Sequence, residues 1–247
     1  MPHLCVIPAR LGSNRLPSKP LRLLNGDPLI AVVAQRVSDL GIADTVVVAT
    51  DDERIVDAVA PTGVEAIMTR RDHRNGTERV AEVAKLTRFE HAEVVINVQG
   101  DEPFISREAV AGAVGRVLSG DALGTAAMPL ARRDVFDRNI VKAVVDEAGY
   151  ALRFCRDVPA SVPLSCRPSV FHHLGVYAYR RSALLHWARL PATLGEIEER
   201  LEQLRPLSHG YRIGVAVVPS MTFSGIDTEE ELQRAQSSAR RLAERVA

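Results

Sequence analysis

The chain has 247 residues, of which 46% are apolar and 25% charged, and its 31 basic side chains balance its 31 acidic ones. This composition is that of an ordinary globular protein, long enough to bury a core without disulfides or a structural metal. The zero net charge argues against a nucleic-acid-binding protein that works by bulk neutralisation of phosphates. We therefore expect one large or two small globular domains and no nucleic-acid partner.

The three cysteines, Cys5, Cys155 and Cys166, are too few for a disulfide framework and indicate a reducing compartment. The first residues, MPHLCVIP, have no basic region followed by an apolar stretch, so no secretory signal is expected. No apolar run approaches the roughly 20 residues that span a membrane. The sequence predicts a soluble, cytoplasmic protein that does not bind membranes.

The first half of the chain alternates short apolar runs with helical patterns. Continuous β-branched runs, such as TVVVA, are typical of strands that are buried on both faces of a parallel sheet. Right-handed crossovers between such strands make a doubly wound α/β domain. The predicted strands are 4–7, 45–49, 64–68 and 93–98, and the predicted helices are 29–40, 51–59, 77–86 and 107–118.

The pattern changes after about residue 123, where strand-like runs follow one another with few helices between them. We expect these runs to form an antiparallel, β-rich portion, inserted over residues 123–210 into a single domain of residues 1–247. After residue 123, the predicted strands are 124–130, 141–145, 151–154, 173–179 and 213–218, and the predicted helices are 184–190, 197–204 and 228–246.

The first predicted strand leads directly into a basic loop, IPARLGSNRLPSKPL. In doubly wound sheets, ligands bind at the carboxyl ends of the strands, near the point where the strand order reverses. Arg10, Arg15 and Lys19 lie in this loop, and three cations at a strand end suit a triphosphate. The loop is neither a P-loop nor a G-x-G-x-x-G fingerprint. The alternative is a solvated basic loop.

The chain contains 28 arginines but only three lysines, Lys19, Lys85 and Lys142. Such a bias is typical of a GC-rich genome and by itself carries no function. A lysine that is kept against this background is a better candidate for a chemically required group than an average lysine. Lys19 and Lys142 are therefore singled out.

Acidic residues follow two other predicted strands. Asp101 and Glu102 in NVQGDEP come after the fourth strand and suit Mg²⁺, which takes one or two carboxylates together with phosphate oxygens and waters. Asp227 in SGIDTE precedes the last predicted helix and could be the second carboxylate. In both places the alternative is capping of the following helix.

Two further segments complete the set of candidates. The polar loop TRRDHRNGTER, at the end of the third strand, places small groups around Gly76 that could contact a base or a ribose; the alternative is a surface loop in which Thr77 caps a helix. His172 and His173 are adjacent, so on a strand they point to opposite faces and do not make a metal pair. The sequence contains no serine–histidine–aspartate motif and no reactive-cysteine context.

Taken together, these loops resemble those of the CMP-KDO synthetases, the cytidylyltransferases that activate 3-deoxy-manno-octulosonate (KDO), within the GT-A-like nucleotidyltransferases. The resemblance covers nearly the whole chain and rests on seven collinear motifs: IPARLGSNRLPSKPL, TRRDHRNGTERVAEV, NVQGDEP, NIVKAVVD, FHHLGVYAYR, LEQLR and GIDT. It implies that CTP and an acidic acceptor give a CMP-linked acceptor and pyrophosphate. The acceptor oxygen would attack the α-phosphorus in line, with Mg²⁺ as cofactor and no obligatory general base. We further expect a homodimer.

The resemblance also implies a role for individual residues. The catalytic set would be Arg10, Arg15 and Lys19 on the triphosphate, with Asp101 and Asp227 as Mg²⁺ ligands. The nucleotide would contact Pro8, Ala9, Arg10, Asn75, Gly76, Arg79 and Gln99, and the family has Ser where this chain has Asn75. The acceptor would contact Gln99, Arg156, His173, Tyr177, Glu202 and Gln203, and Lys142 also falls within a family motif.

Apart from Asn75, the departures of the chain from the family fall on the acceptor side. Only 16 residues separate Arg156 from His173, the segment VPASVPL (158–164) replaces a tryptophan-containing one, and Gly195 stands where Leu is usual. These changes favour a smaller acceptor such as phosphonoformate, which relatives in phosphonate antibiotic pathways use. The arginine-rich, GC-biased composition points the same way, because it suits an actinomycete, which makes no KDO lipopolysaccharide. KDO is the alternative, because His173, Tyr177, Glu202 and Gln203 are kept. A catalytically silent, nucleotide-binding regulatory protein is the alternative from another class.

Overall fold

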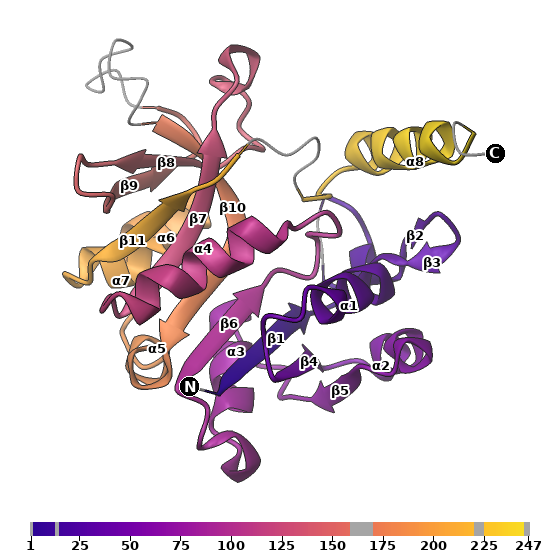
Figure 1. Cartoon of the computed structure of the whole chain (residues 1–247), viewed down its shortest axis with the longest axis horizontal. Helices are drawn as coiled ribbons and strands as arrows, with labels where there is room; N and C mark the ends of the chain where they lie inside the picture. Colours follow the sequence, from indigo (N-terminus) through magenta and orange to yellow (C-terminus); the bar gives the residue numbers. More distant parts are fainter. Residues whose placement is uncertain (1, 13–14, 159–169, 220–224, 245–247) are drawn as a thin grey trace.

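The computed structural model describes residues 2–12, 15–158, 170–219 and 225–244. Its centre is a nine-stranded sheet in which seven strands follow the order β11-β7-β10-β6-β1-β4-β5, while β8 pairs with β10 and β9 pairs with β8 (Figure 1). In the first half of the chain the elements are β1 (His3–Ala9), α1 (Leu29–Asp39), β4 (Thr45–Thr50), α2 (Glu53–Val59), β5 (Glu65–Met68), α3 (Gly76–Ala84), β6 (Val94–Val98) and α4 (Arg107–Leu118). A short hairpin, β2 (Leu23–Leu24) and β3 (Asp27–Pro28), precedes α1.

The four strands of the first half are parallel, as predicted. From β1 the chain builds β4 and β5 on one side and then returns to place β6 on the other side of β1. This reversal makes the doubly wound topology, and the carboxyl ends of β1 and β6 flank its switch point.

The second half extends the same sheet. Its elements are β7 (Leu123–Pro129), β8 (Lys142–Val145), β9 (Ala151–Cys155), β10 (Val170–Arg180), α5 (Arg181–Trp187), α6 (Leu194–Glu199), α7 (Leu204–Ser208), β11 (Ile213–Val217) and α8 (Glu229–Glu244). Strand β10 runs antiparallel to both β6 and β7, whereas β11 is parallel to β7. The antiparallel character that the sequence predicts is therefore carried by β8, β9 and β10.

Alternating residues of β1 belong to two hydrophobic cores, one on each face of the sheet. Cys5 and Ile7 pack with the apolar sides of α1 and α4. Leu4 and Val6 pack with α3 and α5, and the buried Trp187 belongs to the same cluster. Both faces of the sheet are thus covered, which explains why its central strands are continuously apolar.

The helix predicted over residues 197–204 is wrong. Two short helices, α6 and α7, occupy this region, and Arg200 between them has φ 54° and ψ 48°, in the left-handed region. The Arg200 amide donates to the Glu196 carbonyl, which ends α6, and the next residue, Leu201, is buried.

No helix among the described residues is long and apolar enough to cross a membrane.

Candidate active site

A cavity of about 540 Å³ opens at the switch point of the sheet. The loops after β1 and β6, the start of α3, the end of β9 and the segment before α8 contribute to its walls. All seven residues predicted to contact a nucleotide line it: Pro8, Ala9, Arg10, Asn75, Gly76, Arg79 and Gln99. Arg15, Lys19, Asp101 and Asp227 line it as well, so the structure brings the predicted catalytic set together.

Lys19 lies between the two aspartates. Its Nζ is 2.5 Å from Oδ2 of Asp101 and 2.8 Å from Oδ1 of Asp227, and the lysine side chain is only 15% exposed. Burial opposes the ammonium charge, but the two carboxylates outweigh burial and raise the pKa of Lys19 above its usual value. Lys19 is therefore a fixed positive charge in the wall of the cavity.

Arg15 and Arg10 add positive charge to the same cavity. Arg15 donates to Asp227 at 2.7 Å and to the Asn139 side chain at 3.4 Å. Burial would raise the pKa of Asp227, but Lys19 and then Arg15 hold it below its usual value. Arg10 is exposed and has no polar partner among the described side chains, which leaves its guanidinium available to a ligand.

Neither aspartate is a helix cap. Ser106 caps α4, so Asp101 is free of that role. Thr228 and Glu231 form a capping box at the start of α8: the Thr228 hydroxyl accepts from the Glu231 amide, and the Glu231 carboxylate accepts from the amides of Asp227 and Thr228. The side chain of Asp227 is left to face Lys19.

On the nucleotide side, Asn75 and Arg79 have structural partners. Asn75, rather than Thr77, caps α3, because its Oδ1 accepts from the Glu78 amide at 2.9 Å. Arg79 is buried, and its guanidinium donates to Thr69 at 2.5 Å and to Asp51 at 2.9 Å. Arg79 thus ties the loop before α3 to the end of β4 while still lining the cavity.

A second, smaller cavity of about 200 Å³ adjoins the first and is lined by most of the predicted acceptor residues. Gln99, His173, Tyr177, Glu202 and Gln203 line it, whereas Arg156 lines the first cavity. The two cavities share Gln99, Asp101, Asn139, Arg200, Glu202 and Asp227. They are therefore two parts of one cleft.

His173 is a neutral group in this cleft. Burial lowers its pKa to about 3, with the neighbouring His172 as a smaller cause. The Thr125 hydroxyl donates its single proton to the Val176 carbonyl at 2.7 Å, so it accepts from Nε2 of His173 at 2.9 Å. This arrangement assigns the ring proton to Nε2 and leaves Nδ1 as an acceptor. His172 also lines the second cavity.

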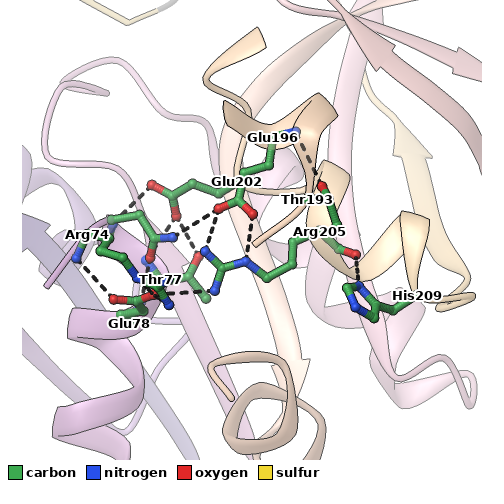
Figure 2. A network of polar contacts seen from close by, with 10 residues as sticks. Arg74, Thr77, Glu78, Thr193, Glu196, Glu202, Arg205 and His209 are labelled. Atoms are coloured by element: carbon green, nitrogen blue, oxygen red, sulfur yellow. Dashed lines mark hydrogen bonds and ion pairs between the residues drawn. The ribbon is translucent and has the colours of Figure 1, made fainter. Parts of the chain in front are cut away.

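Glu202, predicted to contact the acceptor, lies against the first turn of α3. Its carboxylate accepts from the Gly76 and Thr77 amides at 3.0 Å each and from the Thr77 hydroxyl at 2.7 Å. Figure 2 shows this contact beside the buried Arg205, which bonds to Glu196 at 2.5 and 2.7 Å and to Glu78 at 3.3 Å. The network joins the helix that starts at the nucleotide side to the segment that carries the acceptor residues.

Glu102 is the buried carboxyl next to Asp101. Its Oε1 accepts from the Gly175 amide at 2.9 Å, and Oε2 has no partner within the described parts of the chain. A Cβ at position 175 would lie 2.5 Å from Oε1, so only glycine leaves room for this carboxyl. Burial, helped by the charge of Asp101, raises the pKa of Glu102 to about 8, so it is mainly neutral at pH 7.

Lys142 is not part of either cavity. Its Nζ donates to the Asp137 carbonyl and, at 2.7 Å, to the Arg156 carbonyl. Arg156 in turn donates to the carbonyls of Glu199 and Arg138. Lys142 therefore acts on the cleft indirectly, by holding the segments that carry Arg138, Asn139 and Arg156 at its wall.

The structure adds residues to the site that the sequence does not predict. Arg138, Asn139 and Arg200 line the cleft, and Arg205 holds it together. Asn139 and Arg205 fall within the motifs NIVKAVVD and LEQLR, which was the available signal, whereas nothing in the sequence marks Arg138 or Arg200. Ser224 and most of the segment 158–164 lie outside the described residues.

The two aspartates fit a magnesium ion in chemistry and number. Both carboxylates point at one cation, the Lys19 ammonium, and carboxylate oxygens are what Mg²⁺ prefers. Among the described residues, no cluster of three or more His, Cys, Asp or Glu side chains could hold a metal. The protein would supply two ligands, and phosphates and waters would supply the rest.

A doubly wound sheet with this basic, aspartate-lined cleft at its switch point defines a nucleotidyltransferase. Comparison with known proteins agrees with that class: residues 4–213 match the family described as "Cytidylyltransferase". A curated 3-deoxy-manno-octulosonate cytidylyltransferase from Gemmatimonas aurantiaca is 51% identical over an alignment of 243 positions, which covers 96% of this chain and 94% of that protein. The chain belongs to the CMP-KDO synthetase family of cytidylyltransferases.

Solved structures agree with this family. A CMP:2-keto-3-deoxy-manno-octonic acid synthetase complexed with CTP superposes with a TM-score of 0.86 and 36% identity, covering 98% of this chain and 99% of that one. A 4-diphosphocytidyl-2C-methyl-D-erythritol synthase from Anaerococcus prevotii, with a TM-score of 0.64, covers 97% of this chain and 98% of its own. At 14% identity the second likeness concerns the fold alone.

Proposed function

We propose that the chain transfers the cytidylyl group of CTP to KDO, giving CMP-KDO and pyrophosphate. The observation that carries this proposal is the 51% identity, over nearly the full length of both chains, to a 3-deoxy-manno-octulosonate cytidylyltransferase. The structural neighbour that is complexed with CTP supports CTP as the nucleotide. The paired cavities, one basic and one lined by the predicted acceptor residues, suit two substrates.

In the proposed reaction, the side chains of the first cavity position the triphosphate. Arg10 presents a free guanidinium, and Arg15 and Lys19 hold fixed positive charge beside Asp101 and Asp227. A hydroxyl oxygen of the acceptor attacks the α-phosphorus and gives its proton to water. At the same time, the bond from the α-phosphorus to the oxygen that bridges it to the β-phosphate breaks, and pyrophosphate leaves. The cations stabilise the charge that builds up on the departing pyrophosphate.

We further propose that Asp101 and Asp227 hold Mg²⁺ when CTP is bound. The ion would neutralise phosphate charge and orient the reacting groups. Because Lys19 bridges both carboxylates, its ammonium must give up part of this contact to a bound metal and is then available to a phosphate oxygen. Removal of the metal by a chelator is expected to stop turnover, and added Mg²⁺ is expected to restore it.

KDO is proposed ahead of phosphonoformate, which the sequence analysis favoured. The comparisons support KDO because the curated relative and the solved neighbour both act, by name, on this sugar acid or its synonym. His173, Tyr177, Glu202 and Gln203 lie together at the second cavity, and their polar groups suit a polyhydroxylated acceptor. The altered segment 158–164, which prompted the smaller acceptor, lies almost entirely outside the described residues.

The test is a side-by-side assay of the purified chain with CTP, Mg²⁺ and either KDO or phosphonoformate. Pyrophosphate release is followed continuously, and the CMP-linked product is identified by mass spectrometry. We expect CMP-KDO with KDO and little product with phosphonoformate, and we expect UTP and ATP to replace CTP poorly. Turnover with phosphonoformate alone would reverse the choice of acceptor. CTP binding without any turnover would favour a silent regulatory protein.

A further inference from the structure

We propose that Arg200 binds the carboxylate of the sugar-acid acceptor at the junction of the two cavities. This assignment rests on the proposed function, because it needs an acidic acceptor in the second cavity. Arg200 is one of the residues shared by both cavity walls.

The charge pattern of the second cavity points to Arg200. Among the described residues, Arg200 is the only arginine or lysine that lines this cavity, and Arg10, Arg15 and Lys19 line the first cavity alone. His173 and His172 add no charge, because burial lowers their pKa values to about 3 and about 4. Arg200 is thus the fixed positive charge that the described part of the wall offers directly to an acceptor carboxylate, whereas Lys19 is bonded to Asp101 and Asp227.

The guanidinium of Arg200 is also free to bind. It has no hydrogen-bond or ion-pair partner within the described parts of the chain, and its side chain is exposed to the cleft. The neighbouring carboxylates are occupied: Asp101 and Asp227 bond to Lys19, and Glu202 bonds to the amides at the start of α3. An incoming carboxylate would not have to displace an existing partner of Arg200.

The backbone holds Arg200 in a conformation that an arginine adopts only at a cost. Its φ of 54° and ψ of 48° are left-handed, where the Cβ crowds the following carbonyl. Such residues occur where the surrounding structure enforces them, often in binding sites. The conformational cost at Arg200 is therefore what we expect of a residue that binds a ligand in the cleft.

The structure that enforces this turn is the network around Arg205. Figure 2 shows Glu196 held by the bidentate bond from Arg205 and by Thr193, whose hydroxyl accepts from the Glu196 amide. The Glu196 carbonyl then accepts from the amides of both Arg200 and Leu201. On the other side of the turn, Glu202 is fixed to α3. Arg200 is therefore carried by a turn that is anchored at both ends.

The experiment measures the KM values for KDO and CTP in the full-length chain and in the variants Arg200→Gln, Arg200→Gly and Arg200→Lys. Loss of a charge-assisted hydrogen bond is expected to raise the KM for KDO about tenfold in the Gln and Gly variants. The KM for CTP stays within about twofold, because the triphosphate has its own cations. Arg200→Lys is expected to recover part of the loss because it keeps the charge.

Arg200→Gly separates binding from folding. Glycine adopts a positive φ without steric cost, so this variant is expected to melt no earlier than the parent while binding KDO less well. Asn25→Gly is the matched control, because Asn25 has a φ of 58° in the turn between β2 and β3, outside both cavities. That control is expected to keep both KM values.

The identity of the bound group is tested with the carboxamide analogue of KDO. The parent should bind this analogue about tenfold less well than KDO, whereas Arg200→Gln should distinguish the two poorly. If the parent turns over KDO and Arg200→Gln keeps its KM for KDO, the assignment is wrong and the proposed function stands. A rise in the KM for CTP alone would also overturn it. If the parent uses no acid acceptor, the proposed function fails and the assignment with it.

Discussion

Lys19 is the residue on which the charges of the candidate active site converge. It is one of three lysines in a chain with 28 arginines, and it alone bonds to both Asp101 and Asp227 among the described residues. A compact ammonium fits between two carboxylates, whereas the broad guanidinium of arginine presents its donors in a planar fork. The rarity of lysine and the geometry therefore lead to the same residue.

Replacing either aspartate by asparagine removes a charge without changing the shape of the side chain. We expect Asp101→Asn and Asp227→Asn each to lower turnover by about 100-fold or more, because the cleft then lacks a proposed metal ligand. Steady-state rates measured over a range of Mg²⁺ concentrations check this expectation. Asp121→Asn, which loses an ion pair with Arg116 outside both cavities, is the control for a general effect of losing an aspartate. Near-normal turnover in either cleft variant would contradict its role.

His173 gives the fold a measurable dependence on pH. Its pKa is about 3 in the folded chain, below the ordinary value of 6.5 that the unfolded chain has, so the unfolded chain binds the proton first on acidification. The contribution of His173 to the free energy of unfolding is therefore present above about pH 6.5 and is lost as the pH falls towards 3. In His173→Gln, the free energy of unfolding should vary less steeply by up to about 1.4 kcal/mol per pH unit between about pH 6 and 4. Denaturant titrations at several pH values in that range measure the free energy of unfolding of both chains. If the histidine is not responsible, this free energy will vary with pH equally in the parent and in His173→Gln.

At the scale of elements, the turn between α6 and α7 decides how the two halves of the cleft are joined. Within the acidic run 196–202, Glu196 is buried against Arg205, and Glu202 accepts from the amides in the first turn of α3. The helical pattern is interrupted because the left-handed Arg200 turns the chain back towards α3. The acidic side chains thus serve as ties between elements.

Arg205→Met is expected to be strongly destabilising. Its side chain is 2% exposed, so its removal leaves the carboxylate of Glu196 buried without its main partner. Breaking such a pair costs about 3–5 kcal/mol. The double variant Arg205→Met/Glu196→Leu removes both charges and should recover much of the loss. Unfolding by denaturant gives the free energy of unfolding of the parent, the single variant and the double variant. Equal losses of stability in the two variants would show that the broken ion pair is not the cause.

At the scale of the whole molecule, the cleft is assembled from residues that span nearly the full chain, from Pro8 to Asp227. A ligand that bridges these loops binds only the folded chain. CTP at about 100 times its Kd should therefore stabilise the fold by about 2.7 kcal/mol, which corresponds to a rise in Tm of about 5–10 °C. Thermal unfolding with and without CTP checks this, and UTP at the same concentration is the control for nucleotide selectivity.

The homodimer remains a prediction. Strand β9 pairs only with β8 among the described strands, and Leu152 on β9 is 61% exposed. An unpaired edge with an apolar side chain is a surface that a second copy can cover. Light scattering coupled to size-exclusion chromatography measures the mass directly, and a mass near 26.9 kDa at micromolar concentration would contradict the dimer.

The sequence by itself determined the features that depend on neighbours along the chain. Apolar runs separated by helical patterns identified the parallel strands β1, β4, β5 and β6, because burial on both faces leaves a continuous signal. The strand-end loops then placed Arg10, Arg15, Lys19, Asp101 and Asp227 in one cleft, because the carboxyl ends of parallel strands share one edge of the sheet.

The tertiary structure alone decided what depends on contacts between distant segments. Glu202 bonds to Gly76, and Arg205 bonds to Glu78 in addition to the nearby Glu196. Both of these contacts to α3 join residues more than 120 positions apart, and no local pattern encodes such a pairing. The same holds for Arg200, whose helical neighbours in sequence gave no sign of a left-handed turn. Glu102 likewise became a neutral carboxyl only when the fold buried it against Gly175. The sequence specifies which side chains can carry a charge, but tertiary contacts decide the partner of each one and therefore its role.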